Sequence, residues 1–323
     1  VSNFLSSSAL VQLNGSDYIN FRNMTFEVGS GSNIGKLFSF ASNSDNIMLE
    51  GNRFKGSTNG STSTDNAIMY SSSGENNNIE FHNNIFEDGS YGIYFYGSSS
   101  SSYYCDYMTI KENSFFNQEY RSIEMKYHNY ASIDSNYFET NSIESYFRFI
   151  YMSYSDYNDI HSNEMLYTGT SSMSSAAGIY LEYCDNSPSI QKNSIIFGQN
   201  SGRYGIYIYY SDYSLVANNL IQVGYNSSTY GIYIDDSNYN DFYYNNINVS
   251  STSSSSSAIY VRDSYYMNFK NNIFANTGTG YAMYLYNYYS SVFSGGGSDY
   301  NCFWTNGSNL VYGSSSYSTL SQW

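Results

Sequence analysis

The chain has 323 residues, of which 62 are Ser, 41 Asn and 41 Tyr, and it contains a single Pro. Charged residues make up 12% of the chain, about half the usual share, and the net charge is −15. The 20% of aromatic residues argues against disorder, and the small number of Lys and Arg argues against a nucleic-acid partner. No apolar stretch approaches the roughly 18 residues of a membrane helix, so no membrane span is predicted.

A short signature recurs along the chain and indicates a repeat architecture. It consists of an apolar residue, two variable residues, Asn, one variable residue and a second apolar residue, as in Leu49, Asn52 and Phe54. A degenerate copy at Phe21 precedes nine complete ones, and from residue 21 to residue 269 the mean spacing is about 27.6 residues. The nine Asn residues are Asn52, Asn84, Asn113, Asn136, Asn163, Asn193, Asn219, Asn245 and Asn272.

A second signature lies about ten residues before most of these copies and predicts a strand. Ile and Tyr alternate after Gly or Ala, first as Leu10–Leu13 in a weaker form and then as Gly92–Tyr96, Gly205–Tyr209, Gly231–Asp235, Ala258–Arg262 and Ala282–Tyr286. Period-2 alternation is typical of a half-buried strand, and no window shows a helical period with caps. Successive copies can pair in parallel only if the chain winds one coil per repeat, which predicts a β-solenoid.

The Ile-x-x-Asn-x-Phe coil with its Gly-Ile-Tyr strand resembles the right-handed parallel β-helix superfamily, the pectate-lyase-like fold. The resemblance implies an all-β, single-stranded right-handed parallel β-helix of about ten coils of roughly 27 residues. We expect one domain over residues 1–323, with regular coils over 10–290 and an irregular C-terminal end over 291–323. The same coil is shared by polysaccharide lyases, hydrolases, epimerases, tailspikes and adhesins, so the resemblance leaves the function open.

Stacked coils place equivalent residues in columns, and two columns have clear candidate roles. The Asn column is predicted to lie at a turn, where each side-chain amide hydrogen bonds to the neighbouring coils. The outward face of the Gly-Ile-Tyr strand carries aromatic rings. These are either a structural ladder that stabilises a flat sheet or a face for a sugar or a partner protein. They are Tyr94, Tyr96, Tyr151, Tyr180, Tyr207, Tyr209, Tyr233, Tyr260, Tyr284 and Tyr286.

The candidates for catalysis interrupt this Tyr column. Arg121, Glu124, Lys126 and His128 form the one concentration of ionisable types, and a salt-bridged surface patch is the alternative interpretation. In an active site, Lys126 or His128 would be the base and Arg121 would stabilise charge. No paired carboxylates of the kind needed for glycoside hydrolysis stand out.

No metal site and no cofactor are predicted, because the three His residues fall on different coils. The three Cys residues, Cys105, Cys184 and Cys302, are predicted to be unpaired thiols in or near the core, since coil spacing separates them beyond disulfide reach. Of the Asn-x-Ser/Thr triplets, Asn59 and Asn226 lie in predicted loops and are the glycosylation candidates.

The sequence is compatible with two functions. The favoured hypothesis is a non-catalytic extracellular or cell-surface β-solenoid, such as a stalk, an adhesin or a subunit of a filament or appendage. No capping element is evident at either end, so we expect a longer chain or an assembly with copies of itself, end to end or side by side. The alternative is a carbohydrate-binding module or a carbohydrate-active enzyme, namely a polysaccharide lyase or glycoside hydrolase, with a polysaccharide as the partner.

Overall fold

The structure is a computed structural model that describes residues 9–28, 35–41, 43–58, 60–100, 104–198, 202–225, 227–287 and 291–323, with only the backbone of 294–296. The chain falls into two compact units. Unit 1 comprises Val1–Ser142 and Arg148–Glu164, and unit 2 comprises Ile143–Phe147 and Met165–Trp323. Apart from one helical turn, η1 (Thr64–Asn66), the regular elements of the described residues are strands, so the predicted all-β class is confirmed.

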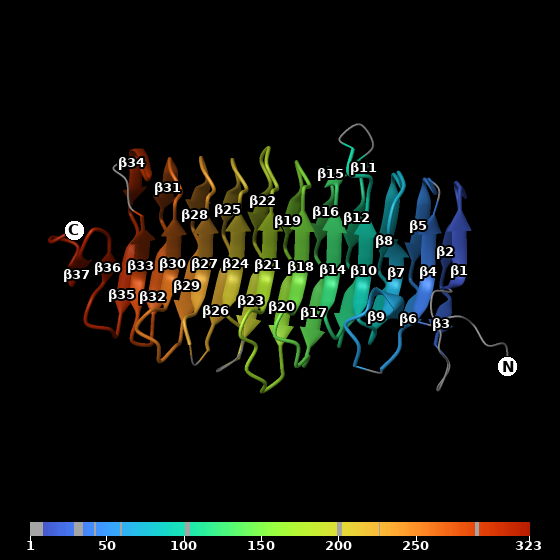
Figure 1. Ribbon diagram of the computed structural model, residues 1–323, viewed down its shortest axis with the longest axis horizontal. Coiled ribbons are helices and arrows are strands. Elements are labelled where there is room, and N and C mark those ends of the chain that lie inside the picture. The colour runs from blue at the N-terminus through green and yellow to red at the C-terminus, as the bar shows by residue number, and fades with distance from the viewer. Residues whose placement is uncertain are drawn as a thin grey trace. The chain divides into compact units, whose positions relative to one another are not determined.

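Unit 1 contains three parallel sheets, here named A, B and C, to which each coil contributes one strand (Figure 1). Sheet A comprises β1 (Ala9–Asn14), β4 (Lys36–Ala41), β7 (Ala67–Ser71), β10 (Tyr91–Tyr96), β14 (Arg121–Lys126) and β18 (Arg148–Ser153). Sheet B comprises β2 (Asn20–Arg22), β5 (Ile47–Glu50), β8 (Ile79–His82), β12 (Thr109–Lys111), β16 (Ser132–Asp134) and β19 (Asp159–His161). Sheet C comprises β3 (Thr25–Glu27), β6 (Arg53–Lys55), β9 (Ile85–Glu87), β13 (Ser114–Phe116) and β17 (Tyr137–Thr140). A short pair, β11 (Cys105–Asp106) and β15 (His128–Asn129), follows sheet A.

Unit 2 repeats the same order, and β20 (Glu164–Tyr167) leads into it. Its sheet A comprises β21 (Ala177–Glu182), β24 (Tyr204–Tyr209), β27 (Tyr230–Asp235), β30 (Ser257–Arg262), β33 (Tyr281–Tyr286) and β36 (Val311–Tyr312). Sheet B comprises β22 (Ser189–Gln191), β25 (Leu215–Ala217), β28 (Asp241–Tyr243), β31 (Met267–Lys270) and β34 (Phe293–Asp299). Sheet C comprises β23 (Ser194–Phe197), β26 (Leu220–Val223), β29 (Asn246–Val249), β32 (Ile273–Asn276) and β35 (Cys302–Thr305).

Parallel pairing in unit 2 continues beyond residue 290. Strands β34, β35 and β36 pair with β31, β32 and β33 and form another coil out of residues expected to be irregular. After it, β37 (Ser316–Tyr317) pairs antiparallel with β36. The Trp323 ring packs at 5.8 Å from Phe293 and 5.9 Å from Phe303, so aromatic rings cover apolar side chains of this last coil.

The core of each coil is filled by the apolar residues of the two signatures. In sheet C of unit 1, Phe54, Phe86, Phe115 and Phe138 are fully buried, and consecutive rings stack at 5.2, 4.6 and 4.8 Å. The Gly next to the Ile of several sheet A strands has a steric reason: a Cβ on Gly231 would lie 2.2 Å from the Ile247 side chain. A small residue there lets sheet A approach sheet C closely.

The nine Asn residues of the repeat lie in the turn between sheets B and C, and their side chains are almost fully buried. In unit 2, Asn245 Oδ1 accepts hydrogen bonds from the backbone N and the Nδ2 of Asn219, and Asn245 Nδ2 donates to Val216 O and to Asn272 Oδ1. Asn301 adds another rung at the C-terminal side, accepting from Asn272. The amides therefore satisfy buried backbone groups in the coils on both sides.

A second ladder occupies the corner between sheets A and B, and the sequence survey missed it. It is built from a triad whose first residue points inward, whose second is mostly Asp or Asn, and whose third is usually Tyr with a left-handed backbone. The Asn238 backbone N donates to Asp212 Oδ1 at 2.6 Å, and the Tyr265 backbone N donates to Asn238 Oδ1 at 3.0 Å. The triads that end in Tyr are Ser16-Asp17-Tyr18, Cys105-Asp106-Tyr107, His128-Asn129-Tyr130 and Ser155-Asp156-Tyr157 in unit 1, and Ser211-Asp212-Tyr213, Ser237-Asn238-Tyr239 and Ser264-Tyr265-Tyr266 in unit 2.

Candidate functional site on sheet A

Three of the four ionisable residues proposed for catalysis share the outward face of β14. Glu124 is only 3% exposed, and its carboxylate pairs with the guanidinium of Arg121. The Tyr96 hydroxyl of the neighbouring strand donates to Glu124 Oε1 at 2.6 Å. A carboxylate this buried needs such partners, because an unpaired buried charge is strongly destabilising. We call Tyr96, Arg121, Glu124 and Lys126 the sheet A cluster.

Burial and the Glu124 charge set the protonation of the groups around this carboxylate. Burial raises the pKa of Tyr96 well above its usual value, and the Glu124 charge and hydrogen bond add to that rise. Burial lowers the pKa of Arg121 while Glu124 raises it, and the net direction is upward. Tyr96 therefore stays a neutral donor and Arg121 stays a cation over the whole physiological range.

Lys126 lies at the end of the same strand, beside aromatic rings. Its ammonium nitrogen lies 5.5 Å from the Tyr96 ring centroid and 5.1 Å from the centroids of both Tyr127 and Tyr154. Within the described part of the chain Lys126 forms no ion pair with a carboxylate. Its charge is thus held by ring faces rather than neutralised.

His128 does not join this cluster. Strand β14 ends at Lys126, Tyr127 adopts a left-handed backbone with φ 61°, and the chain then turns His128 inward. His128 is fully buried, and burial lowers its pKa to about 3. An interior imidazole with this pKa does not meet a substrate, so the expectation that His128 faces the same surface as Lys126 is wrong. The left-handed turn breaks the period-2 alternation on which that expectation rested.

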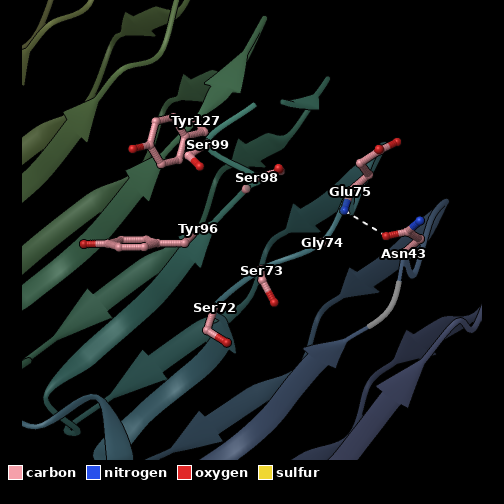
Figure 2. A pocket seen from close by; sticks show the side chains of 10 residues that line it. Asn43, Ser72, Ser73, Gly74, Glu75, Tyr96, Ser98, Ser99 and Tyr127 are labelled. Atoms are coloured by element: carbon pink, nitrogen blue, oxygen red, sulfur yellow. Dashed lines mark hydrogen bonds between the residues drawn. The ribbon is translucent and has the colours of Figure 1, made fainter. Parts of the chain in front are cut away.

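A shallow groove of about 540 Å³ adjoins the cluster in unit 1, at the C-terminal ends of the sheet A strands β7, β10 and β14. Figure 2 shows the Tyr96 and Tyr127 rings at one side and Asn43 and Glu75 at the other, where the Glu75 backbone N donates to Asn43 Oδ1 at 2.9 Å. The floor between them is lined by Ser72, Ser73, Gly74, Gly97, Ser98 and Ser99. Tyr96 belongs to both features, and the Lys126 ammonium lies 5.1 Å from the centroid of the Tyr127 ring that lines the groove, so the sheet A cluster adjoins it.

The Tyr residues of the predicted outward column lie on sheet A in register, and the column is longer than the sequence survey recognised. Tyr70 pairs with Tyr94 in unit 1, and Tyr312 pairs with Tyr284 in unit 2. Several of these rings stack face to face: Tyr70 and Tyr94 lie 5.4 Å apart at 6°, and Tyr233 and Tyr260 lie 4.6 Å apart at 4°. Tyr207 instead meets Tyr180 at 55° and Tyr233 at 67°. Where neighbours stack, sheet A presents ring edges and hydroxyl groups rather than open aromatic platforms.

In unit 2 the outward face of sheet A carries a different buried charge. Asp235 is 1% exposed, and its carboxylate accepts from Arg262 Nε at 2.5 Å and from the Tyr207 hydroxyl at 3.3 Å. Together with Asp236 and Asp263 it forms the one group of three potential metal ligands, within the described residues, whose ligand atoms lie within 4.8 Å. Both oxygens of Asp235 already accept hydrogen bonds, from Arg262 and Tyr207, so we assign this carboxylate a structural role.

The Cys residues are free thiols, with Cys105 and Cys184 buried and Cys302 exposed. Cys105 occupies the inward position of a corner triad, where its Sγ accepts from the Asn76 backbone N at 3.3 Å as a Ser hydroxyl would. The exposure of Cys302 differs from the expected place in or near the core. The glycosylation candidates Asn59 and Asn226 lie outside the described residues. No described helix has the length and apolar character needed to cross a membrane.

The sequence model of the family described as Right handed beta helix region matches residues 66–202. That of the Periplasmic copper-binding protein (NosD) family matches residues 166–323. The fold resembles that of the periplasmic alginate epimerase AlgG, with a TM-score of 0.62, 14% identity, and coverage of 92% of this chain and 74% of that chain. It also resembles a DFA-IIIase from Arthrobacter chlorophenolicus A6 in complex with DFA-III, with a TM-score of 0.50, 11% identity, and coverage of 83% and 70%. No curated protein sequence matches the chain.

The parallel coils and these matches define a right-handed β-helix protein. The chain has the right-handed parallel β-helix fold, as its repeat predicted. At 11% to 14% identity the structural similarity establishes the fold alone.

The copper named by the NosD family finds no suitable ligands in the matched segment. Residues 166–323 contain no His, and their one cluster of His, Cys or carboxylate ligands within the described residues consists of carboxylates. Cys184, Met173, Met267 and Met283 are fully buried, and the exposed Cys302 belongs to no such cluster in the described part of the chain. Copper prefers imidazole, thiolate and thioether ligands, whereas carboxylate oxygens suit harder cations. The residues present therefore do not fit copper.

Proposed function

We propose that the protein binds an acidic polysaccharide on the outward face of sheet A in unit 1. The observation that carries this proposal is a cation without a carboxylate partner, within the described residues, on an acidic molecule. The chain has a net charge of −15, and the sheet A strands of unit 1 contain the cationic residues Lys36, Arg121, Lys126 and Arg148. Lys36 pairs with Asp65, Arg121 pairs with Glu124, and Arg148 is buried, so Lys126 is the cation that this face offers to a ligand. Such a charge favours an anionic ligand.

The geometry of the face suits a polymer of hydroxyl-rich, charged sugars. Tyr hydroxyls and ring edges line sheet A, and the Ser-lined groove continues from Tyr96. Because stacking covers the ring faces of Tyr70, Tyr94 and Tyr96 in unit 1, recognition there would rest on charge and hydrogen bonds more than on stacking of sugars against rings. The names of the structural neighbours, alginate epimerase and DFA-IIIase, support a carbohydrate ligand more than they support the stalk, adhesin or filament hypothesis.

Binding accounts for the site better than hydrolysis does. Glycoside hydrolysis requires a pair of carboxylic groups about 5 to 10 Å apart. Glu124, the single carboxylate on the sheet A strands of unit 1, is committed to Arg121 and Tyr96. Lys126 is the one predicted base candidate beside the groove, so a lyase-type proton abstraction is the reaction to test beside binding.

The test is a binding measurement with alginate and polygalacturonate as acidic polymers and a neutral glucan as comparison. We expect binding of the acidic polymers, weakened by salt, and at least a fivefold lower affinity for Lys126→Glu, since one cation becomes an anion, on the order of 1 kcal/mol. The matched control is Lys270→Glu, the same charge change on sheet B of unit 2, where no ion pair is lost in the described structure.

Equal binding by Lys126→Glu and the parent protein would refute the site, and a preference for the neutral glucan would refute the ligand class. Absorbance of unsaturated uronate products, followed in the same samples and lost in Lys126→Ala, would add lyase activity to binding.

We also infer a location outside the cytoplasm. The NosD family and AlgG are both described as periplasmic, and polysaccharides of the proposed class are extracytoplasmic polymers. Recovery of the native protein in a cytoplasmic fraction would contradict this inference.

A further inference from the structure

Six Tyr residues form two exposed stacks at the corner between sheets A and B. Each is the third residue of a corner triad and has a left-handed backbone, with φ between 54° and 62°. Their side chains are among the exposed large residues of the molecule, with 42% to 56% of the residue surface accessible. The unit 1 stack comprises Tyr107, Tyr130 and Tyr157, and the unit 2 stack comprises Tyr213, Tyr239 and Tyr266.

Consecutive rings in each stack are close and nearly parallel. In unit 1 the centroid distances are 5.2 Å for Tyr107 and Tyr130 and 5.1 Å for Tyr130 and Tyr157, at interplanar angles of 15° and 7°. In unit 2 they are 5.1 Å for Tyr213 and Tyr239 and 4.7 Å for Tyr239 and Tyr266, at 7° and 12°. Backbone hydrogen bonds between coils, such as Tyr213 N to Asn238 O at 3.0 Å, hold the turns in register.

This arrangement leaves the phenol edges open to solvent while it holds neighbouring rings together. We propose that the two Tyr stacks are sites of oxidative cross-linking within the chain, by a peroxidase with hydrogen peroxide as the oxidant. Each of two neighbouring phenols gives up one electron and one proton. The resulting phenoxyl radicals join through ring carbons ortho to the hydroxyls, and the two hydrogens on those carbons shift to the oxygens. The pair loses two hydrogen atoms in total, and the peroxide is reduced to two molecules of water.

Stacking favours a bond within the chain over a bond between molecules. A radical formed on Tyr239 already has a phenol about 5 Å away on either side, at an effective concentration far above that of a second molecule. Each bond would join one coil to the next, because ring neighbours come from successive coils. The three Cys residues are free thiols, so these bonds would be covalent links between coils that the cysteines do not provide.

Tyr244 offers an internal comparison. It is 60% exposed, more than any ring in the stacks, and it has no aromatic ring contact in the described part of the structure. Reactivity governed by exposure alone would favour Tyr244, whereas reactivity governed by stacking would favour the two corner stacks.

The experiment treats the intact protein at low concentration with peroxidase and hydrogen peroxide. We expect dityrosine fluorescence, a monomer band on a denaturing gel, and cross-linked peptides that join neighbours within each stack. In Tyr239→Phe, the cross-links of the unit 2 stack should disappear, because Phe is not oxidised and Tyr213 and Tyr266 are then two coils, about 10 Å, apart. The stacked pair Tyr183 and Tyr210, also in unit 2, lies outside this stack and should still react. The unit 1 cross-links serve as the internal reference, and Tyr244→Phe should change neither set.

Three results would overturn the proposal. These are the absence of dityrosine, cross-links only between molecules, or cross-links within the unit 2 stack that persist in Tyr239→Phe. Because Phe preserves the ring stack, circular dichroism of Tyr239→Phe should match that of the parent protein and so separate loss of the phenol from loss of the fold. The outcome is independent of polysaccharide binding, which involves sheet A and not this corner.

Discussion

At the scale of the residue, the buried Asn amides connect the coils, and Asn245 shows how much one of them contributes. Replacing it with Ala removes the acceptor of the Asn219 backbone N and the donor to Val216 O. Each buried polar group left without a partner costs about 1 to 3 kcal/mol. We expect Asn245→Ala to lower the free energy of unfolding by about 3 kcal/mol or more, measured by chemical denaturation.

The neighbouring Asn246 provides the control, because it lies on β29 with its side chain exposed. Asn246→Ala should change the free energy of unfolding by less than about 0.5 kcal/mol. Equal effects of the two substitutions would show that the ladder does not carry the stability assigned to it.

His128 gives a prediction with a defined pH window. In the unfolded chain an imidazole takes up a proton below about pH 6.5, whereas burial lowers the pKa of His128 in the folded chain to about 3. Between these values the unfolded state binds more protons, so stability falls as the pH falls. His128→Ser places at this position the residue found at the equivalent position of the next coil, Ser155. It should reduce the dependence of the unfolding free energy on pH by up to about 1.4 kcal/mol per pH unit.

The measurement is the free energy of unfolding of both proteins between about pH 6.5 and pH 4, where acidic side chains contribute equally to each. Asn246→Ala, which removes no titratable group, is the control and should retain the slope of the parent protein. Parallel curves for the parent protein and His128→Ser would contradict a buried neutral imidazole.

At the scale of the element, the strands of sheet A hold many of their Tyr residues in protonated form. Burial raises the pKa of Tyr207 well above 10, and it raises that of Tyr284 to about 12. Unfolded Tyr loses its proton near pH 10, so above that pH the unfolded state binds fewer protons and stability falls as the pH rises. At about pH 11 the native protein should therefore show fewer ionised Tyr residues than the same protein in urea.

Phenolate absorbance measures that difference. The Tyr residues that stay protonated in the native protein should ionise at the pH at which the circular dichroism signal of the strands is lost. Identical titration curves for the native and the urea-unfolded protein would show that sheet A does not shield its Tyr residues.

The strands themselves were predictable because a period-2 pattern at a fixed interval leaves few other folds open. Ile93 and Ile123 fall inside and Tyr94 and Glu124 outside, as alternation requires. Period-2 alternation does not predict side-chain directions at the corner between sheets A and B. A left-handed residue such as Tyr127 reverses the alternation there and turns His128 into the core. The recurring Ser-Asx-Tyr triad was the available signal, and it would have assigned His128 to a corner position.

Tertiary pairing explains why the candidate site was only partly predictable. The sequence places Arg121, Glu124 and Lys126 on one strand, but the contact of Tyr96 with Glu124 depends on the register between β10 and β14. Tyr96 and Glu124 are 28 residues apart in the sequence, and the length of the turns between the two strands sets their register. The groove beside Tyr96 arises from such turns, which have no regular pattern in the sequence.

At the scale of the whole molecule, a solenoid should tolerate the loss of one complete coil and not the loss of half of one. Asn219 and Asn245 are 26 residues apart and occupy equivalent rungs. Deleting residues 220–245 joins Asn219 to Asn246 and removes β26, β27 and β28 together. Neighbouring coils then keep their columns in register, because each coil contacts only the coils next to it.

We expect the protein without residues 220–245 to fold, with a lower free energy of unfolding and an unchanged strand signal per residue in circular dichroism. Deleting residues 220–232 instead joins Asn219 to Tyr233 in the middle of a strand and moves every later column out of register. That protein should be insoluble or unfolded, since a register error places polar residues in the core and apolar residues outside. If both deletions behaved alike, stability would not depend on coil register, and the columns of Asn, Phe and Tyr would be a consequence of the repeat rather than the interactions that hold it together.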